Sequence, residues 1–262
     1  PDIDLAVRTF RKRVVFAFTT FKHANFDNVK FEKDVNFYRV IFRGNANFNK
    51  AIFRGNARFA FAEFEGEASF REASFEKYAS FENGKFKGYA DFSEAKFNIA
   101  SFENAEFKDV AEFIESTFIN AVWFNYAKFE NKASFESAKF CEENKKGIKC
   151  TIDFRGARFN SVEFDNADFN GETYFFRAFF FDTSFRETVF RQTVYFNYST
   201  INHAVFEEAI FASRVKFDGV TIKSALVLSD LVQLNLLRPL ISQAYISMRN
   251  IKLESGAKVE LN

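Results

Sequence analysis

One pattern constrains the fold of this chain more than any other. A Phe recurs every five or six residues, and a small or β-branched residue stands two positions before it. The stretch from Ala68 to Phe97 contains Ala-Ser-Phe three times, then Gly-Lys-Phe, Ala-Asp-Phe and Ala-Lys-Phe. Neither the helical period of 3.6 residues nor the two-residue alternation of a long strand fits this spacing. A five-residue step with two inward positions fits one side of a four-sided coil, whose turns stack about 4.8 Å apart.

The repeated Phe residues supply the expected core. The chain has 42 Phe among its 262 residues, and each buried Phe stabilises a fold by about 1.5–3 kcal/mol. We place the first repeat centre at Phe10 and the last at Ile222, with small partners such as Ala95 and Ala100 two positions before a Phe. Twenty of the expected core centres, all before the one interruption of the repeat, are Phe37, Phe42, Phe48, Phe53, Phe59, Phe64, Phe70, Phe75, Phe81, Phe86, Phe92, Phe97, Phe102, Phe107, Phe113, Phe118, Phe124, Phe129, Phe135 and Phe140.

The six-residue steps follow a rule of their own. When the centres are numbered from Phe10 as one, every six-residue step leads to an even-numbered centre, as at Phe16, Phe37 and Phe48. In a four-sided coil the added residue then always falls before one of two opposite sides, like a regularly placed bulge. We expect coils of roughly 20–22 residues and a rod of about ten coils, roughly 45–50 Å long.

On these residues the chain resembles the pentapeptide-repeat family, whose motif is A-(D/N)-(L/F)-x-x. The resemblance covers roughly residues 10 to 228. It implies an all-β fold, a right-handed quadrilateral parallel β-helix in which the central Phe and the small residue two before it fill the interior. The chain departs from the family pattern by using Phe almost throughout and by its six-residue steps.

The segments outside the repeat suggest two ends and one insertion. The Phe register is lost after Ile222, and Pro239 suits the first turn of a helix. A solenoid must cover its last open layer, so we expect a small C-terminal cap with helix within 229–250 and a strand or frayed tail after it. The expected parts are an N-terminal cap segment at 1–13, the β-helix at 14–228 with an inserted loop at 141–153, and the C-terminal cap at 229–262.

Cys141 and Cys150 flank the central part of the inserted loop. The residues between them are rich in Lys and Glu and include a Gly. That composition is typical of an exposed excursion. Two alternatives stay open: a disulfide at the base of the loop, or a pair of reduced thiols, which a cytosolic location favours. A zinc site is not expected, because it needs four ligands and His23 and His203 lie far away in the repeat order.

Several aromatic residues stand outside the core register. Trp123, Tyr174 and Tyr195 each precede an even-numbered centre, and these centres differ by four or eight sides, so we expect the three side chains on one outer face. An exposed apolar patch often marks an interaction surface, whereas outward aromatics can also simply stack along the rod and stabilise it. Asp153 occupies the same position in the coil between Trp123 and Tyr174, and three off-register Phe residues lie next to this face or around the neighbouring corner of the coil. The candidate patch, called the aromatic surface below, consists of Trp123, Asp153, Tyr174, Phe176, Phe179, Phe181 and Tyr195.

The sequence carries no catalytic constellation. It has no phosphate-binding Gly loop, no G-x-S-x-G and no H-E-x-x-H. Carboxylates are frequent at outward positions, such as Glu65 and Glu103, but Lys and Arg interleave with them as on a solvated face of mixed charge. We therefore expect no enzymatic activity, no cofactor, no metal site and no small-molecule substrate.

Charge and hydropathy exclude further classes. The formal net charge is +1, which disfavours both direct nucleic-acid binding and a strongly acidic mimic of nucleic acid. The sequence has no run of about 18 apolar residues, so we expect no membrane span. No signal peptide is recognisable, which favours a cytoplasmic location, although the chain opens at Pro1 rather than Met.

Two functions remain after these exclusions. The first is a non-catalytic scaffold that binds an unknown protein partner through the flat faces of the solenoid. The alternative is a DNA-mimicking protein that binds and protects the topoisomerase gyrase, as known for some proteins with this fold; it needs a broad negative face. A fold does not decide between them. We expect a monomer or a dimer through the C-terminal segment, where the family sometimes places its dimer contact.

Overall fold

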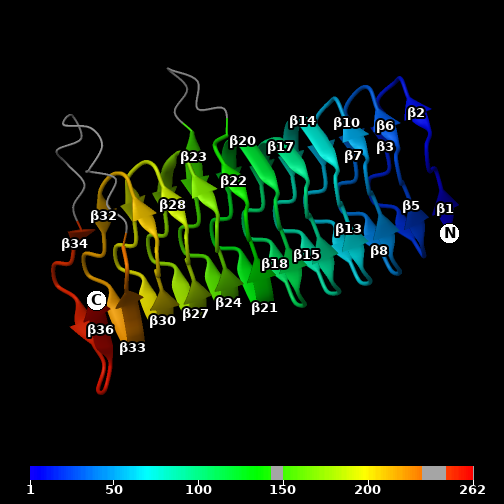
Figure 1. Cartoon of the computed structure of the whole chain (residues 1–262). Helices are drawn as coiled ribbons and strands as arrows, with labels where there is room; N and C mark the ends of the chain where they lie inside the picture. Colours follow the sequence, from blue (N-terminus) through cyan, green and yellow to red (C-terminus); the bar gives the residue numbers. More distant parts are fainter. Residues whose placement is uncertain (143–149, 232–245, 262) are drawn as a thin grey trace.

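The chain folds into a parallel β-solenoid of about ten turns. The computed structural model describes residues 1–142, 150–231 and 246–261. The turns stack along one axis from the N-terminus at one end to the C-terminus at the other (Figure 1). Their strands form two 18-stranded sheets, A and B, which appear as the lower and upper rows of arrows (Figure 1).

Most strands are only two residues long, because each is a single side of a coil. Sheet A contains β1 (Ile3–Asp4), β4 (Thr20–Phe21), β5 (Ala24–Asn25), β8 (Ile41–Phe42), β9 (Ala46–Asn47), β12 (Glu63–Phe64), β13 (Ala68–Ser69), β15 (Lys85–Phe86), β16 (Ala90–Asp91), β18 (Glu106–Phe107), β19 (Ala111–Glu112), β21 (Lys128–Ser134), β24 (Arg158–Glu163), β27 (Phe179–Ser184), β30 (Thr200–Val205), β33 (Thr221–Leu228), β35 (Lys252–Leu253) and β36 (Lys258–Leu261). Sheet B contains β2 (Thr9–Phe10), β3 (Val14–Val15), β6 (Lys30–Phe31), β7 (Val35–Asn36), β10 (Ile52–Phe53), β11 (Ala57–Arg58), β14 (Ser74–Ser80), β17 (Lys96–Ser101), β20 (Thr117–Trp123), β22 (Lys139–Phe140), β23 (Thr151–Asp153), β25 (Asp168–Phe169), β26 (Glu172–Tyr174), β28 (Val189–Phe190), β29 (Val194–Tyr195), β31 (Ile210–Phe211), β32 (Val215–Lys216) and β34 (Ile246–Ser247).

Four repeat steps make one turn. Phe10 pairs with Phe31, Phe31 with Phe53, and Phe53 with Phe75, each four centres further along the chain. The other sides behave in the same way, so residues at one position of successive turns form a ladder along the rod. All twenty Phe named above as core centres are at most 2% exposed.

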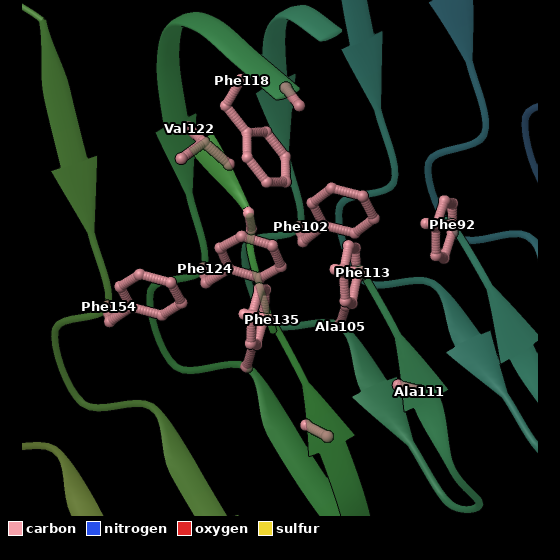
Figure 2. Close-up of a cluster of buried hydrophobic side chains, with 14 of the residues drawn as sticks. Phe92, Phe102, Ala105, Ala111, Phe113, Phe118, Val122, Phe124, Phe135 and Phe154 are labelled. Atoms are coloured by element: carbon pink, nitrogen blue, oxygen red, sulfur yellow. The ribbon is translucent and has the colours of Figure 1, made fainter. Parts of the chain in front are cut away.

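The core is built from ordered Phe columns (Figure 2). The ring of Phe113 stacks on Phe92 and Phe135 in its own column, with centroids 4.9 and 4.8 Å apart. It also meets Phe102 and Phe124 of the opposite column edge to face, each at 5.4 Å. Buried Ala111 and Val122 line the same interior (Figure 2). The even-numbered centres therefore interlock across the core, in the offset and edge-to-face geometries that aromatic rings prefer.

A tight turn follows each even-numbered centre. After Phe37, the N–H of Val40 donates to the carbonyl oxygen of Phe37 at 3.1 Å, and the residue between them, Arg39, has φ of 54°. A left-handed third residue is the signature of a type II-like β-turn. The left-handed residues at this position are Phe18, Asn28, Arg39, Lys50, Phe61, Glu72, Asn83, Glu94, Asn104, Glu115, Tyr126, Ser137, Gly156, Asn166, Arg177, Glu187, Tyr198, Glu208 and Gly219.

This turn explains the rule of the six-residue steps. The step from an even to an odd centre runs through a closed turn of fixed length, whereas the step from an odd to an even centre has no such closure. Where a six-residue step pairs with a five-residue one, the ladder shifts register, as between Phe75 and Tyr78 and between Phe129 and Lys132. These bulges lie before even-numbered centres, as the sequence predicted.

The N-terminal end differs from the expectation, whereas the segment after 250 forms strands, one of the two alternatives expected for it. The N-terminal segment is not a separate cap, because Ile3 pairs with Ala24 and Phe10 with Phe31, so the solenoid begins at β1. At the C-terminus, 232–245 and most of the expected helix lie outside the described residues. The described part, 246–261, adds further strands: Ile246 pairs with Val215 and Val259 with Leu226. The described residues contain no helix, and hence none long and apolar enough to cross a membrane.

Truncation of one interlocked ring tests the core. We expect Phe113→Ala to lower the free energy of unfolding by about 3–5 kcal/mol, because the cavity removes stacking and edge-to-face contacts together. The matched control is Phe18→Ala, since Phe18 is 70% exposed and should cost no more than about 0.5 kcal/mol. Denaturant unfolding measures both. A loss below about 1 kcal/mol for Phe113→Ala would contradict the interlocked core.

A substitution at a left-handed position tests the turn. Asn104 is exposed and has φ of 55°. We expect Asn104→Val to destabilise the fold by about 1–2 kcal/mol, because a β-branched side chain is strained in this conformation. Asn104→Gly should be close to neutral, since Gly adopts positive φ freely. Equal thermal midpoints for the two variants would show that the turn does not impose this geometry.

Candidate interaction surface

The structure places four residues of the aromatic surface on one ladder of sheet B. Trp123 of β20 pairs with Asp153 of β23, Asp153 with Tyr174 of β26, and Tyr174 with Tyr195 of β29. The ladder continues to Lys216 of β32. The rings of Tyr174 and Tyr195 stack at 5.0 Å, and the Lys216 Nζ lies 5.0 Å from the centre of the Tyr195 ring. The shared face is the one that the spacing predicted.

The side chain of Tyr174 is held by the stacked ring of Tyr195 and by a hydrogen bond. Its hydroxyl donates to Glu172 Oε2 at 2.8 Å. Burial, assisted by this hydrogen bond, raises the pKa of Tyr174 to about 12. The hydrogen bond to Glu172 therefore holds the phenol in one orientation.

Asp153 is buried and binds Arg155, which its position in the sequence did not predict. It is fully buried, and its two carboxylate oxygens accept from Arg155 Nε at 2.9 and 2.7 Å. Its Oδ1 also accepts from the Arg155 backbone N–H at 2.9 Å. This hydrogen bonding raises the pKa of Arg155. Asp153 therefore positions a guanidinium at the corner of the rod and is not itself a contact residue.

The three off-register Phe lie around that corner. Phe176 sits in the turn after Phe175 and meets the ring of Tyr198 edge to face at 5.4 Å. Phe179 and Phe181 flank the core residue Phe180 on sheet A. Phe181 is 51% exposed, so the aromatic surface extends from sheet B to sheet A within one coil.

A groove lies beside Phe179 on sheet A. It has a volume of about 400 Å³ and an apolar floor formed by Phe129 and Phe159. Arg158 lies over the ring of Phe179, with its guanidinium carbon 5.7 Å from the ring centre. The remaining lining is polar: Lys128, Glu130 and Asn160.

Sequence reasoning missed this groove. Its walls come from three successive coils, in which Lys128, Arg158 and Phe179 occupy one ladder. The repeat numbering contains that alignment. What it does not contain is the direction of the long side chains, which decides whether a hollow remains between them.

The two cysteines lie together at the base of the insertion. The structure joins Cys141 and Cys150 in a disulfide, with Cα atoms 6.0 Å apart, where the sequence had favoured reduced thiols. Both sulfurs lie against the carbonyl oxygen of Asn120 in the preceding coil. The core register resumes directly after Cys150, with Ile152 buried. Residues 143–149 of the loop lie outside the described residues.

The two histidines remain apart, as the repeat order implied. His203 Nδ1 lies 2.9 Å from Asp182 Oδ1 across one coil boundary, while His23 lies near the N-terminal end beside Gly44. Among the described residues, His, Cys, Asp and Glu form no group of three or more that suits a metal ion.

The match to a protein-family model agrees with this architecture. Residues 48–96 match the family model described as pentapeptide repeats (9 copies). Among solved structures the chain is similar to HetL, a pentapeptide repeat protein involved in heterocyst differentiation regulation from the cyanobacterium Nostoc sp. strain PCC 7120. The identity is 11%, over 87% of this chain and 88% of HetL, with a TM-score of 0.40. It is also similar to QnrB1, a plasmid-mediated fluoroquinolone resistance protein, with 12% identity over 90% of this chain and 92% of that one and a TM-score of 0.22. No curated protein matches the chain in sequence.

The packing around the disulfide gives a testable prediction. A Cβ added to Gly171 would lie 2.5 Å from Cys141 Sγ. We expect Gly171→Ala to destabilise the fold by about 1–3 kcal/mol through overpacking. The same change in a Cys141→Ala/Cys150→Ala background should cost clearly less, because the clashing sulfur is gone. A double-mutant cycle measures this coupling, and additive effects would contradict the placement of the sulfur.

Proposed function

Because this chain is a pentapeptide-repeat protein, we propose that it is a non-catalytic scaffold that binds another protein through the aromatic surface. The observation that carries the proposal is the concentration of outward aromatic side chains in one coil. Tyr174, Phe176, Phe179 and Phe181 all face outward around the buried Phe175 and Phe180. Aromatic residues and Arg are the types enriched at protein–protein interfaces.

The groove suggests how a partner is held. Its apolar floor suits an apolar side chain of the partner, while Lys128, Glu130 and Arg158 supply a charged rim. An apolar anchor in a pocket surrounded by polar groups is the arrangement found at interface hot spots. We expect a partner that presents one large apolar residue flanked by charges.

Stacking along the rod explains only part of the aromatic surface. Tyr174 and Tyr195 stack on each other, and such cross-strand pairs stabilise a sheet. Phe181 has no ring beside it in its ladder, where its carbonyl oxygen accepts from Asn202 of the next coil. A Phe that is half exposed and unstacked adds little to stability, so a role in binding accounts for it better.

DNA mimicry remains the second candidate, and one corner of the rod favours it. The turns after Phe70, Phe92 and Phe113 each carry an acidic residue at the left-handed position, Glu72, Glu94 and Glu115. Their spacing is one charge per coil, about 4.8 Å, against one per roughly 1.7 Å of duplex DNA. Glu94 is also paired with Arg71. This sparse row is a weak imitation of a duplex, so we rank gyrase binding below protein binding at the aromatic surface.

In this proposal the rod is the right-handed, four-sided coil that the resemblance implies. It acts in the cytoplasm without a cofactor or small-molecule substrate. It is a monomer or a dimer through the C-terminal segment, of which 232–245 lie outside the described residues.

Site-specific crosslinking tests the binding surface. A photo-crosslinking amino acid is placed at Phe181 or, as a matched control, at Glu65, which occupies the same ladder position in an earlier coil. We expect a discrete crosslinked protein from position 181 only. The purified partner should then bind Phe179→Ala/Phe181→Ala at least about tenfold more weakly, with no change for Phe61→Ala. Equal crosslinking from both positions, or unchanged affinity of the double variant, would refute the proposal.

A further inference from the structure

The net charge of +1 conceals a strong separation of charge along the rod. Residues 1–58 contain twelve Lys and Arg against five Asp and Glu, a formal charge of +7. The rest of the chain contains 24 against 30, a formal charge of −6. Whole-chain balance was the reason to expect no direct nucleic-acid binding, and it does not describe this end of the molecule.

The excess positive charge gathers on sheet B of the first coils. The segments 11–13, 32–34 and 54–56 connect β2 to β3, β6 to β7 and β10 to β11, so they stack in three successive turns. Arg54 NH1 reaches Glu32 Oε2 at 2.8 Å, which confirms that these segments adjoin. The middle segment also carries two acidic residues, Glu32 and Asp34. The cations of these segments and of the neighbouring strands are called the basic face: Arg8, Arg11, Lys12, Arg13, Lys30, Lys33, Arg54 and Arg58.

Most of these cations lack the ion pairs seen elsewhere in the rod. In the middle coils Lys87 is paired with Glu63 and Glu65, and Lys128 with Glu106 at 2.7 Å. In the part of the chain that the structure describes, Arg11, Lys12 and Arg13 are exposed and form no ion pair. Their charge is therefore available to an external anion.

An aromatic edge runs beside the basic face. Phe18, Tyr38 and Phe61 lie in successive turns, with ring centres 5.5 and 5.7 Å apart. Arg39 lies over Tyr38 and Phe61, at 5.4 and 5.5 Å from their ring centres. Arg58 of the basic face lies over Tyr38 at 4.3 Å, so the two features are continuous. Phe18 is 70% exposed and Phe61 45%, which leaves ring surface open to a ligand.

We propose that the first coils bind single-stranded nucleic acid, with phosphates on the basic face and unpaired bases against Phe18 and Phe61. A cationic groove or row flanked by aromatic platforms is how such strands are bound without sequence preference. The basic face extends over three successive turns along the rod, with Glu32 and Asp34 among its cations in the middle turn, so the phosphates of an extended strand can follow it. A duplex hides its bases in the stack, so it would use the cations and leave the aromatic edge idle.

The experiment is fluorescence anisotropy of a labelled dT oligomer of about 12 nucleotides, longer than the smallest single-strand sites, titrated with the full chain over a range of salt concentrations. Arg11→Glu/Arg13→Glu should weaken binding at least tenfold. It should also reduce the slope of log K against log salt by roughly 1.4, at about 0.7 for each lost phosphate contact. The matched control is Lys85→Glu/Lys96→Glu, with the same change in net charge at exposed positions in the middle coils; it should bind normally.

Phe18→Ala separates nucleic acid from other polyanions. We expect it to weaken dT binding at least about fivefold through lost stacking while leaving the salt slope and heparin binding unchanged. Circular dichroism checks the fold of each variant, and Arg11→Gln/Arg13→Gln replaces the charge reversal if that variant is unstable.

The proposal is overturned by absence of dT binding at low salt, by equal loss of binding in the matched control, or by unchanged dT binding of Phe18→Ala. Binding to vesicles with about 30% anionic lipid, but not to dT, would instead assign the basic face to a membrane surface.

Discussion

Edge-to-face contact between opposite Phe columns is the interaction on which this solenoid depends. Each even-numbered ring stacks on its own column and inserts between two rings of the column across the core, as Phe113 does between Phe102 and Phe124. The interior has no room for larger neighbours, which is why Ala111 and other small residues stand two positions before a Phe. This packing favours one register between successive coils, because a coil displaced from it would lose the edge-to-face contacts of its rings.

The closed turn after each even-numbered centre is the second constraint. It holds non-Gly residues such as Arg39 and Glu94 in a left-handed conformation, at a cost of roughly 1–2 kcal/mol each, which the buried Phe layers offset. The chain can lengthen only where no such turn closes. The disulfide-bonded insertion between Phe140 and Phe154 lies in a step of that kind, where the sequence already places single added residues.

Function, by contrast, depends on positions that the repeat leaves free. Outward positions tolerate any polar residue, so clusters there are informative. One cluster is aromatic and lies around Phe181; the other is basic and lies around Arg11. They lie near β27 and β2, which are in different parts of the rod (Figure 1), so the two proposed sites are on separate coils.

The sequence by itself determined the solenoid, the four-step turn, the core Phe residues and the shared face of Trp123, Tyr174 and Tyr195, because a strict repeat converts residue number directly into position. Only the tertiary structure decided the pairing of β34, β35 and β36 with the preceding coil, the burial of Asp153 against Arg155, the groove beside Phe179 and, among the described residues, the lack of ion pairs at Arg11. These depend on side-chain direction and on pairing between coils. A periodic pattern carries none of that information, since it fixes where each Cα lies and not what the side chain meets.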